Sequence, residues 1–306
     1  MNMISRRRAL TILAAATTLP ASAMADVPIY TWQGRALGAR ATLRLAHPDA
    51  GAIAARAASE IDRLEDVFSL FRPQSALSRL NRQGSLEAPP FELLQCLSLA
   101  GRVHEATQGL FDPTVQPLWR VYADAAVDGR SPRTVDLSKA RDKIGWNGVH
   151  FAPDQITLEP GMALTLNGIA QGCIADRLAD LLAAEGLDNI LIDTGELRAM
   201  GGDPNGKSWN VQLVDGRQVP LKARALATSA PRGTTFGEGT SGASHILDPK
   251  RGVPVPAQWR EISISAPSAG LADALSTAAC LFPTKSGIQS CVRSFQDVRV
   301  ERISAA

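Results

Sequence analysis

Asp273 and Thr277 stand four residues apart in the run Asp-Ala-Leu-Ser-Thr. If this segment is helical, a carboxylate and a hydroxyl lie one above the other on a single face of the helix. Mg²⁺ prefers such hard oxygen ligands and commonly takes only a few of them from the protein. The pair also suits a structural role, in which Asp273 interacts with the helix dipole and Thr277 bonds a backbone carbonyl. The spacing alone leaves both interpretations open.

His245 lies in a run that ends in Asp248-Pro249, with Gly252 three residues further on. Asp-Pro followed by Gly is typical of a turn at a strand end, which places His245 near the rim of a site. Histidine is the natural proton acceptor near neutral pH. A lone histidine is also a common structural residue, so this segment alone does not decide whether His245 is a catalytic base or a structural residue.

Closely spaced glycines, Gly168 and Gly172, follow an apolar, strand-like run that includes Thr165 and Leu166. A helical pattern begins after them. Glycine lets backbone approach a ligand, and a helix start offers free N–H groups to an anion. The segment is therefore typical of one that grips a phosphorylated ligand, although a single glycine-rich turn is weak evidence.

Two further loops carry groups that could contact a flat, charged ligand. Gly109 ends a predicted helix, and the loop after it could present Asp112. Phe71, before Arg72-Pro73, could lay its ring against a ligand or close the hydrophobic core. The alternative for the first loop is a simple helix stop.

The first 25 residues predict a cleaved export signal. Three arginines at residues 6–8 precede a short apolar stretch and an A-x-A site that ends at Ala25. The stretch is too short to remain as a membrane span, and the arginines match the twin-arginine type. We therefore expect residues 26–306 to form the mature domain and to act in the periplasm. An ordinary secretory signal is the alternative.

The mature charge argues against a nucleic-acid partner. The leader removes three of the 32 basic residues and none of the 30 acidic ones, so the mature chain has a net charge of 29 − 30 = −1. No long basic run remains, and the chain lacks the electrostatic footprint of a nucleic-acid-binding protein. The four cysteines have no metal-like spacing. Cys280 and Cys291 could pair across a short loop, or all four could be buried thiols.

Helical patterns cluster early in the chain and strand patterns late, which predicts an α+β fold. The expected elements are a hairpin over 28–46, helices over 53–71 and after Pro89-Pro90, a helix over 173–185, a strand over 189–193, a hairpin with strands at 209–214 and 218–227, a strand over 261–266 and a helix over 269–282.

Taken together, these motifs resemble the ApbE family of Mg²⁺-dependent FAD:protein FMN transferases, in the family's order and over nearly all of the mature chain. The resemblance rests on the segments from Phe71 to Asn81, Gly109 to Thr114, Gly168 to Gly172 with Asp176, Ala227 to Arg232, Ser244 to Pro249 and Asp273 to Thr277. The variant L-N-G-I-A-Q-G and the leader are similar to the NosX-like branch, which serves nitrous oxide reductase maturation.

The resemblance implies an α+β, T-fold-like arrangement of mixed sheets with packed helices, and a central cleft for FAD and Mg²⁺. It implies transfer of FMN from FAD to a Thr or Ser hydroxyl of an exported or membrane flavoprotein, with release of AMP. Asp273, Thr277 and the carbonyl of Gly168 would bind Mg²⁺, and His245 would be the base. The residues that would line the FAD site are Leu37, Phe71, Leu110, Phe111, Asp112, Thr165, Gln171 and Leu247.

The chain departs from the family pattern at four places. Thr165 stands where the family commonly has Asp, Gln171 where it has Lys or Glu, and Phe71 where it has Tyr. The usual paired glycine reads Gly195-Glu196. These departures bear on the FAD contacts more than on the metal site.

The resemblance also implies an acceptor protein with an S/D-G-A-T/S motif, such as a NosR-like flavoprotein, and at most peripheral membrane contact through it. The chain's own Ser241-Gly242-Ala243-Ser244 resembles that motif, but its place directly against His245 indicates a coincidence within a loop. Two alternatives are a periplasmic FAD-binding carrier without transferase activity and an FAD pyrophosphatase.

Overall fold

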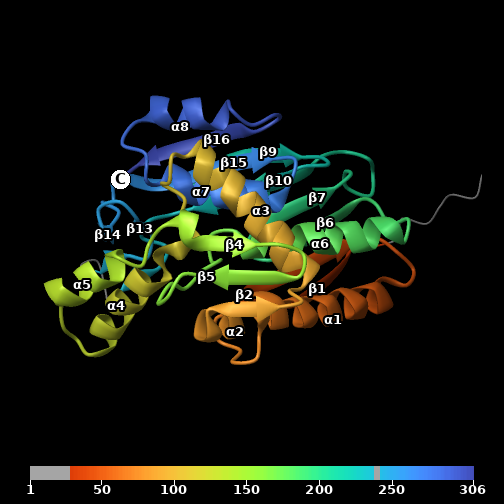
Figure 1. Cartoon of the computed structure of the whole chain (residues 1–306). Helices are drawn as coiled ribbons and strands as arrows, with labels where there is room; N and C mark the ends of the chain where they lie inside the picture. Colours follow the sequence, from red (N-terminus) through yellow and green to blue (C-terminus); the bar gives the residue numbers. More distant parts are fainter. Residues whose placement is uncertain (1–27, 238–241) are drawn as a thin grey trace, which may run out of the picture.

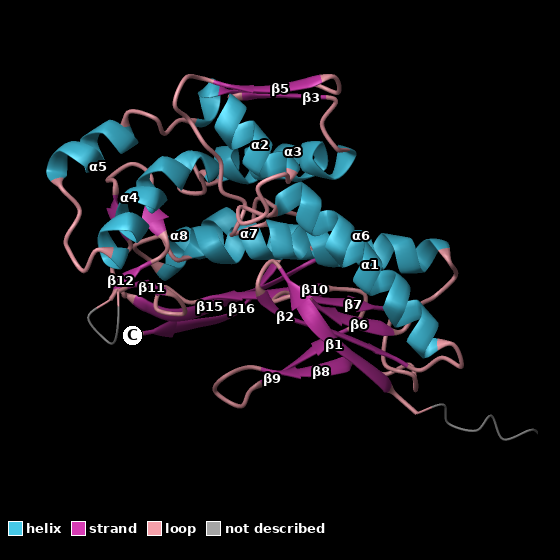
Figure 2. Cartoon of the chain, turned by 90° about the horizontal axis from the view of Figure 1, so that it is seen from below, coloured by secondary structure: helices cyan, strands magenta, loops and turns pink. Residues whose placement is uncertain are grey.

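A seven-stranded antiparallel sheet forms the centre of the computed structural model, which describes residues 28–237 and 242–306. Helices α1, α6 and α7 cover one face of this sheet (Figures 1 and 2). In sheet order, its strands are β1 (Tyr30–Ala36), β2 (Ala39–Leu45), β6 (Ile190–Asp193), β7 (Leu197–Met200), β10 (Ala225–Ser229), β15 (Trp259–Ala266) and β16 (Arg299–Ala305). The expected α+β class is confirmed.

The described residues contain eight α-helices, three of which cover the sheet. They are α1 (Ala50–Phe68), α2 (Ala76–Gln83), α3 (Phe91–Ala106), α4 (Gln116–Val127), α5 (Thr134–Arg141), α6 (Ala170–Ala184), α7 (Ala269–Ala279) and α8 (Lys285–Val292). Short 3₁₀ turns span Pro113–Val115 and Trp146–Gly148. None of the helices in the described ranges combines the length and apolar composition that a membrane crossing needs.

Smaller sheets complete the fold. One has the order β3 (Ser85–Glu87), β5 (Gln155–Leu158), β4 (Val149–Phe151), and the others are the pairs β8 (Trp209–Gln212) with β9 (Gln218–Leu221), β11 (Thr235–Phe236) with β12 (Ala243–Ser244), and β13 (Leu247–Asp248) with β14 (Val253–Pro254). The predicted leader and Ser241 lie outside the described residues.

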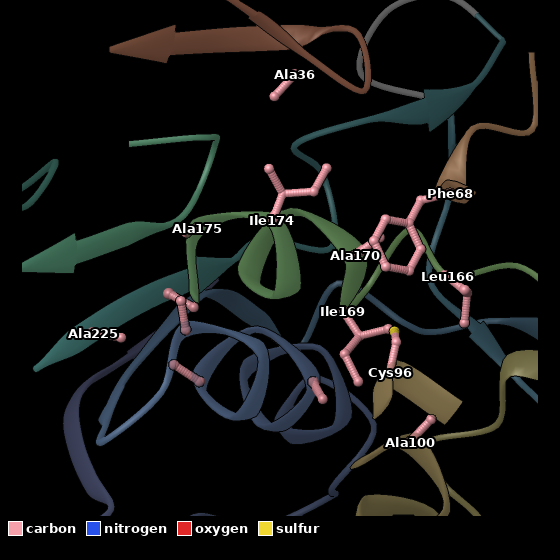
Figure 3. Packing of buried hydrophobic residues seen from close by; sticks show 14 of the residues in the cluster. Ala36, Phe68, Cys96, Ala100, Leu166, Ile169, Ala170, Ile174, Ala175 and Ala225 are labelled. Carbon is pink, nitrogen blue, oxygen red and sulfur yellow. The ribbon is translucent and has the colours of Figure 1, made fainter. Parts of the chain in front are cut away.

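The main hydrophobic core lies between the central sheet and its helices. Alanines dominate α7, and Ala272, Ala274 and Ala278 are fully buried. Their small side chains let this helix lie close against β10 and β15. In Figure 3, Phe68 lies near Ala170, which brings the end of α1 next to the start of α6. Burial of this apolar surface is the main stabilising term.

The β8–β9 hairpin covers part of the opposite face of the sheet (Figure 2). Trp209 and Leu221 pack there against Leu191 and Leu226. The prediction of a single strand over 218–227 is wrong in one respect, because the structure divides this range into β9 and β10. Ala223 has a positive φ of 49° between them, a conformation that breaks a strand.

Two other expectations about local structure are wrong. The run at Thr165 and Leu166 is irregular rather than a strand, and α6 begins at Ala170 instead of residue 173. The first long helix ends at Phe68, so Phe71 is not on it. The backbone becomes extended at Ser69, whose hydroxyl accepts the Phe71 N–H at 3.0 Å and so holds the chain in a turn.

Candidate active site

A cavity of about 360 Å³ lies between the start of α6, one face of α7, the loop after α3 and the segment that carries His245. Ten of the twelve residues predicted for the site line it. They are Leu110, Phe111, Asp112, Thr165, Gly168, Gln171, His245, Leu247, Asp273 and Thr277. The structure therefore gathers most of the candidate residues, although they span more than 160 positions in the sequence.

Asp273 is the most deeply buried acid at this cavity, with 3% of its surface exposed. Its Oδ2 accepts a hydrogen bond from the Gly172 N–H at 3.3 Å. Burial raises the pKa of Asp273 to about 7, against the effect of that hydrogen bond, and the nearby charge of Asp176 adds to the rise. A cation in the cavity would favour the ionised form.

Thr277 follows one turn later on α7, as its spacing predicted, and its Oγ1 lies 3.2 Å from the Ser229 Oγ. Gly168 packs against this side chain, because a Cβ built on Gly168 would come within 3.0 Å of the Thr277 Oγ1. The glycine backbone can therefore approach the hydroxyl where any other residue would crowd it.

These groups fit a Mg²⁺ site. Among the described residues no cluster of three His, Cys, Asp or Glu could hold a metal. A cation here would depend instead on Asp273, Thr277 and the Gly168 carbonyl, with the rest of its shell from substrate and water. That set contains only hard oxygen donors and few protein ligands, as Mg²⁺ usually requires.

Gly172 works differently from the interpretation of its segment in the sequence. We expected the N–H groups at the start of α6 to be free for an anion. The Gly172 N–H is directed instead to the carboxylate of Asp273. A Cβ on Gly172 would overlap the carbonyl of Ala269, so this glycine permits close packing of α6 on α7. Its role here is to bring two helices together.

Asp176, four residues further along α6, holds the start of α7. Its two carboxylate oxygens accept the N–H groups of Ala269 at 2.7 Å and Gly270 at 2.8 Å. Free N–H groups at a helix start are commonly satisfied in this way. The Arg198 guanidinium lies 3.3 Å from the same carboxylate. Asp176 thereby orients the helix that carries Asp273 and Thr277.

His245 has one ring nitrogen fixed by the backbone. Its Nδ1 lies 2.8 Å from the carbonyl oxygen of Thr234. A carbonyl only accepts, so Nδ1 carries the proton and Nε2 of the neutral ring keeps a lone pair. Burial lowers the pKa of His245, while the bond to Thr234 acts in the opposite direction. The ring is therefore neutral at pH 7 and can accept a proton.

The loop after α3 forms one wall of the cavity. Asp112 uses Oδ1 to accept the Thr114 N–H at 2.8 Å and the Thr114 hydroxyl at 2.6 Å, which fixes the 3₁₀ turn. The Thr165 N–H donates to the Pro113 carbonyl and ties the glycine segment to this wall. The side chain of Gln171 packs over Gly195, where a Cβ would collide with it.

Leu37 and Phe71 do not line this cavity. Leu37 occupies the β1–β2 turn with a φ of 48°, and its N–H donates to the Glu65 Oε1 at 2.8 Å. Phe71 is 82% exposed in the loop after α1. Their predicted contacts with FAD would therefore have to be made by a part of the ligand that extends outside the cavity.

Glu196 is a residue at the cavity that sequence reasoning did not select. It has 8% of its surface exposed, and burial, followed by the charge of Asp273, raises its pKa well above its ordinary value. The departure at Gly195-Glu196 was the available signal, since an acid there replaces a glycine of the family pattern. Trp119 also lines the cavity and belongs to none of the motifs in the sequence, whereas Ser229 lies in the segment Ala227 to Arg232 but was not selected as a site residue.

All four cysteines are free in the structure. The Sγ of Cys280 lies near the carbonyls of Ser229 and Ser276, whereas that of Cys291 lies near the carbonyl of Ala106. The two side chains thus have different partners, and the alternative of buried or partly buried thiols describes them.

The fold and the cavity define an α+β protein whose buried site combines hard oxygen donors, a neutral histidine and apolar walls. Its sequence matches the model of the ApbE family over residues 37–300, and the chain belongs to that family. The chain is 24% identical to the FAD:protein FMN transferase of Haemophilus influenzae, covering 87% of this chain and 84% of that one. It is 30% identical to the enzyme of the same name from Vibrio cholerae, covering 72% and 71%.

A solved structure shares the fold. The ApbE protein of Thermotoga maritima superposes with a TM-score of 0.80 at 24% sequence identity, over 91% of this chain and 97% of that one.

Proposed function

We propose that this protein is a Mg²⁺-dependent FAD:protein FMN transferase that moves FMN to a Thr or Ser hydroxyl and releases AMP. Family membership and the names of its relatives support the reaction. The observation that carries the proposal is the meeting of His245, Asp273 and Thr277 at one cavity, which four separate segments build.

In this reaction the acceptor oxygen forms a bond to the phosphorus of the FMN half, and the pyrophosphate bond to AMP breaks. A hydroxyl has a pKa far above 7 and needs a base within hydrogen-bond reach. His245 can take the proton on Nε2, because Nδ1 is held by Thr234. The Thr234 carbonyl then stabilises the protonated ring.

Asp273, Thr277 and Gly168 would hold Mg²⁺, which supplies charge neutralisation to the pyrophosphate. Phosphoryl transfer depends mainly on positioning and on such neutralisation. The apolar walls, which include Leu110, Phe111 and Leu247, suit the uncharged faces of a nucleotide and exclude water.

We also propose that the protein acts in the periplasm after loss of residues 1–25, on an exported or membrane flavoprotein with an S/D-G-A-T/S motif. The leader pattern supports the compartment. The L-N-G-I-A-Q-G variant supports the finer proposal of a NosX-like enzyme with a NosR-like acceptor.

The test follows AMP release and protein-bound flavin fluorescence together, with a candidate acceptor present and absent. We expect AMP release to depend on the acceptor and to match flavin attachment. A carrier would release no AMP under either condition. A pyrophosphatase would release AMP at one rate regardless of the acceptor, without attachment, and either pattern would overturn the proposal.

A further inference from the structure

A second, larger cavity of about 950 Å³ lies next to the candidate active site and shares no lining residue with it. We call it the basic groove. It is bounded by the end of α2, strand β5, the loop at residues 160–163, and helices α4 and α5. In Figure 1, α4 and α5 form the projecting left-hand part of the molecule, next to β4 and β5. None of the twelve predicted site residues belongs to the groove.

The groove has an excess of positive charge although the whole chain is nearly neutral. Its cations are Arg82, Arg120, Arg130, Lys139 and Lys143, and its acids are Asp124 and Asp136. Asp136 is already engaged by Arg133. The side chains of Arg120 and Lys143 make no hydrogen bond or ion pair with any described residue. Three net positive charges thus line one open cavity, which would attract an anionic partner.

Gln116 provides an independent sign of a missing partner. This residue begins α4, lines the groove and has only 6% of its surface exposed. Its Oε1 is buried and accepts no hydrogen bond from the described part of the chain. Buried polar atoms are nearly always paired, and an orphan oxygen requires a donor. An ionised carboxylate has no hydrogen to donate, whereas a polypeptide has an N–H at nearly every residue.

The groove and the candidate active site share a wall one chain layer thick. Asp112 and Pro113 face the active-site cavity, and Gln116 on the same turn faces the groove. In the segment that faces this turn, Thr165 lines the active-site cavity and Ala163 lines the basic groove. The Thr165 N–H bonds to the Pro113 carbonyl at 2.8 Å and joins the two segments. A polypeptide in the groove would therefore lie directly behind the catalytic cavity.

We propose that the basic groove binds an extended acidic segment of the acceptor protein. Its carboxylates pair with Arg120, Lys139 and Lys143, and one of its backbone N–H groups donates to the Gln116 Oε1. This docking holds the acceptor while its hydroxyl enters the neighbouring cavity. The inference rests on the proposed transferase function, because only that function requires a protein acceptor.

The test uses two short fluorescein-labelled peptides that carry the sequence Ser-Gly-Ala-Thr. In one the flanking residues are Asp and Glu, and in the other they are Asn and Gln at the same positions. Fluorescence anisotropy without FAD measures binding alone. We expect the acidic peptide to bind the wild type at least about tenfold more tightly, and the preference to weaken with added salt.

The double variant Arg120→Glu/Lys143→Glu should lose about tenfold in affinity for the acidic peptide and leave FAD binding unchanged. Gln116→Leu should weaken both peptides equally, because it removes the backbone contact. Lys285→Glu, which reverses an exposed charge on α8, is the matched control and should bind both peptides as the wild type does.

Equal binding of the two peptides, or unchanged binding by the double variant, would overturn the groove. Displacement of the acidic peptide by inorganic phosphate at equal concentration would also overturn it, because the occupant would then be a small anion. Charge-dependent binding without flavin transfer would support the groove and contradict the proposed function. If the double variant transfers flavin with an unaltered KM for the acidic peptide, the result would support the proposed function and contradict the groove.

Discussion

Asp273→Asn should make the metal-free protein more stable while it removes the metal site. Burial raises the pKa of Asp273 from 3.8 to about 7. A carboxyl whose pKa is higher in the folded than in the unfolded state lowers stability as the pH rises between the two values. Each pKa unit corresponds to about 1.4 kcal/mol. At about pH 8 the ionised Asp273 therefore costs the metal-free fold about 4 kcal/mol, and at about pH 5 less than about 2 kcal/mol.

The asparagine is uncharged and its Oδ1 can still accept the Gly172 N–H. We therefore expect Asp273→Asn to exceed the wild type in metal-free stability by up to about 4 kcal/mol at about pH 8, which is roughly 8 °C in Tm for a chain of this length. The gain should shrink by more than half at about pH 5. Calorimetry in the presence of a chelator measures both values.

Added Mg²⁺ should raise the Tm of the wild type and leave that of Asp273→Asn unchanged, because a ligand stabilises only the state that binds it. Thr277→Val is the matched control. It removes a ligand without a change in charge, so it should weaken the Mg²⁺ effect and keep the wild-type pH dependence. The reasoning is refuted if Asp273→Asn is less stable than the wild type at about pH 8, or if Mg²⁺ stabilises both equally.

Three further predictions concern other parts of the site. His245→Gln should bind FAD and Mg²⁺ normally but lose at least about a hundredfold in transfer rate. Because burial lowers the pKa of His245, the wild-type rate should fall in acid only below the ordinary histidine pKa. A pH–rate profile with an unshifted or raised pKa would contradict the assignment. Gly172→Ala should cost at least about 2 kcal/mol in urea unfolding, since the new methyl overlaps the Ala269 carbonyl, a backbone atom that cannot rotate away; Gly51→Ala, with open space around it, is the control and should be neutral or stabilising. Glu196→Gln should weaken Mg²⁺ binding about tenfold in titrations without FAD, because it removes a second buried acid beside Asp273. An unchanged affinity for Mg²⁺ would show that the charge of Glu196 does not contribute to metal binding.

The local patterns in this chain predicted the placement of the candidate site residues better than the tertiary contacts around them. The spacing of Asp273 and Thr277 needs only a helix to bring the two oxygens together, and α7 provides it. His245 likewise lies near a turn and at the cavity, as its Asp-Pro context indicated. Such features depend on a few neighbouring residues, so a sequence reveals them.

Features that depend on tertiary contacts could not be predicted in this way. The cap that Asp176 provides to α7 joins residues more than 90 positions apart. The use of Gly172 to pack two helices, rather than to bind an anion, depends on where α7 passes. Phe71 continued a helical pattern in the sequence, but the turn at Ser69 removes it from the core and exposes it.

Intact-mass analysis of an acceptor protein tests the central claim most directly. The acceptor is incubated with FAD, Mg²⁺ and wild-type protein, and AMP in the same sample is quantified. The account predicts a mass gain of one FMN phosphoester on a Thr or Ser, one AMP for each acceptor modified, and neither product with Asp273→Asn or with Mg²⁺ removed. AMP formation with no change in acceptor mass, or flavin attachment that persists in Asp273→Asn, would contradict it.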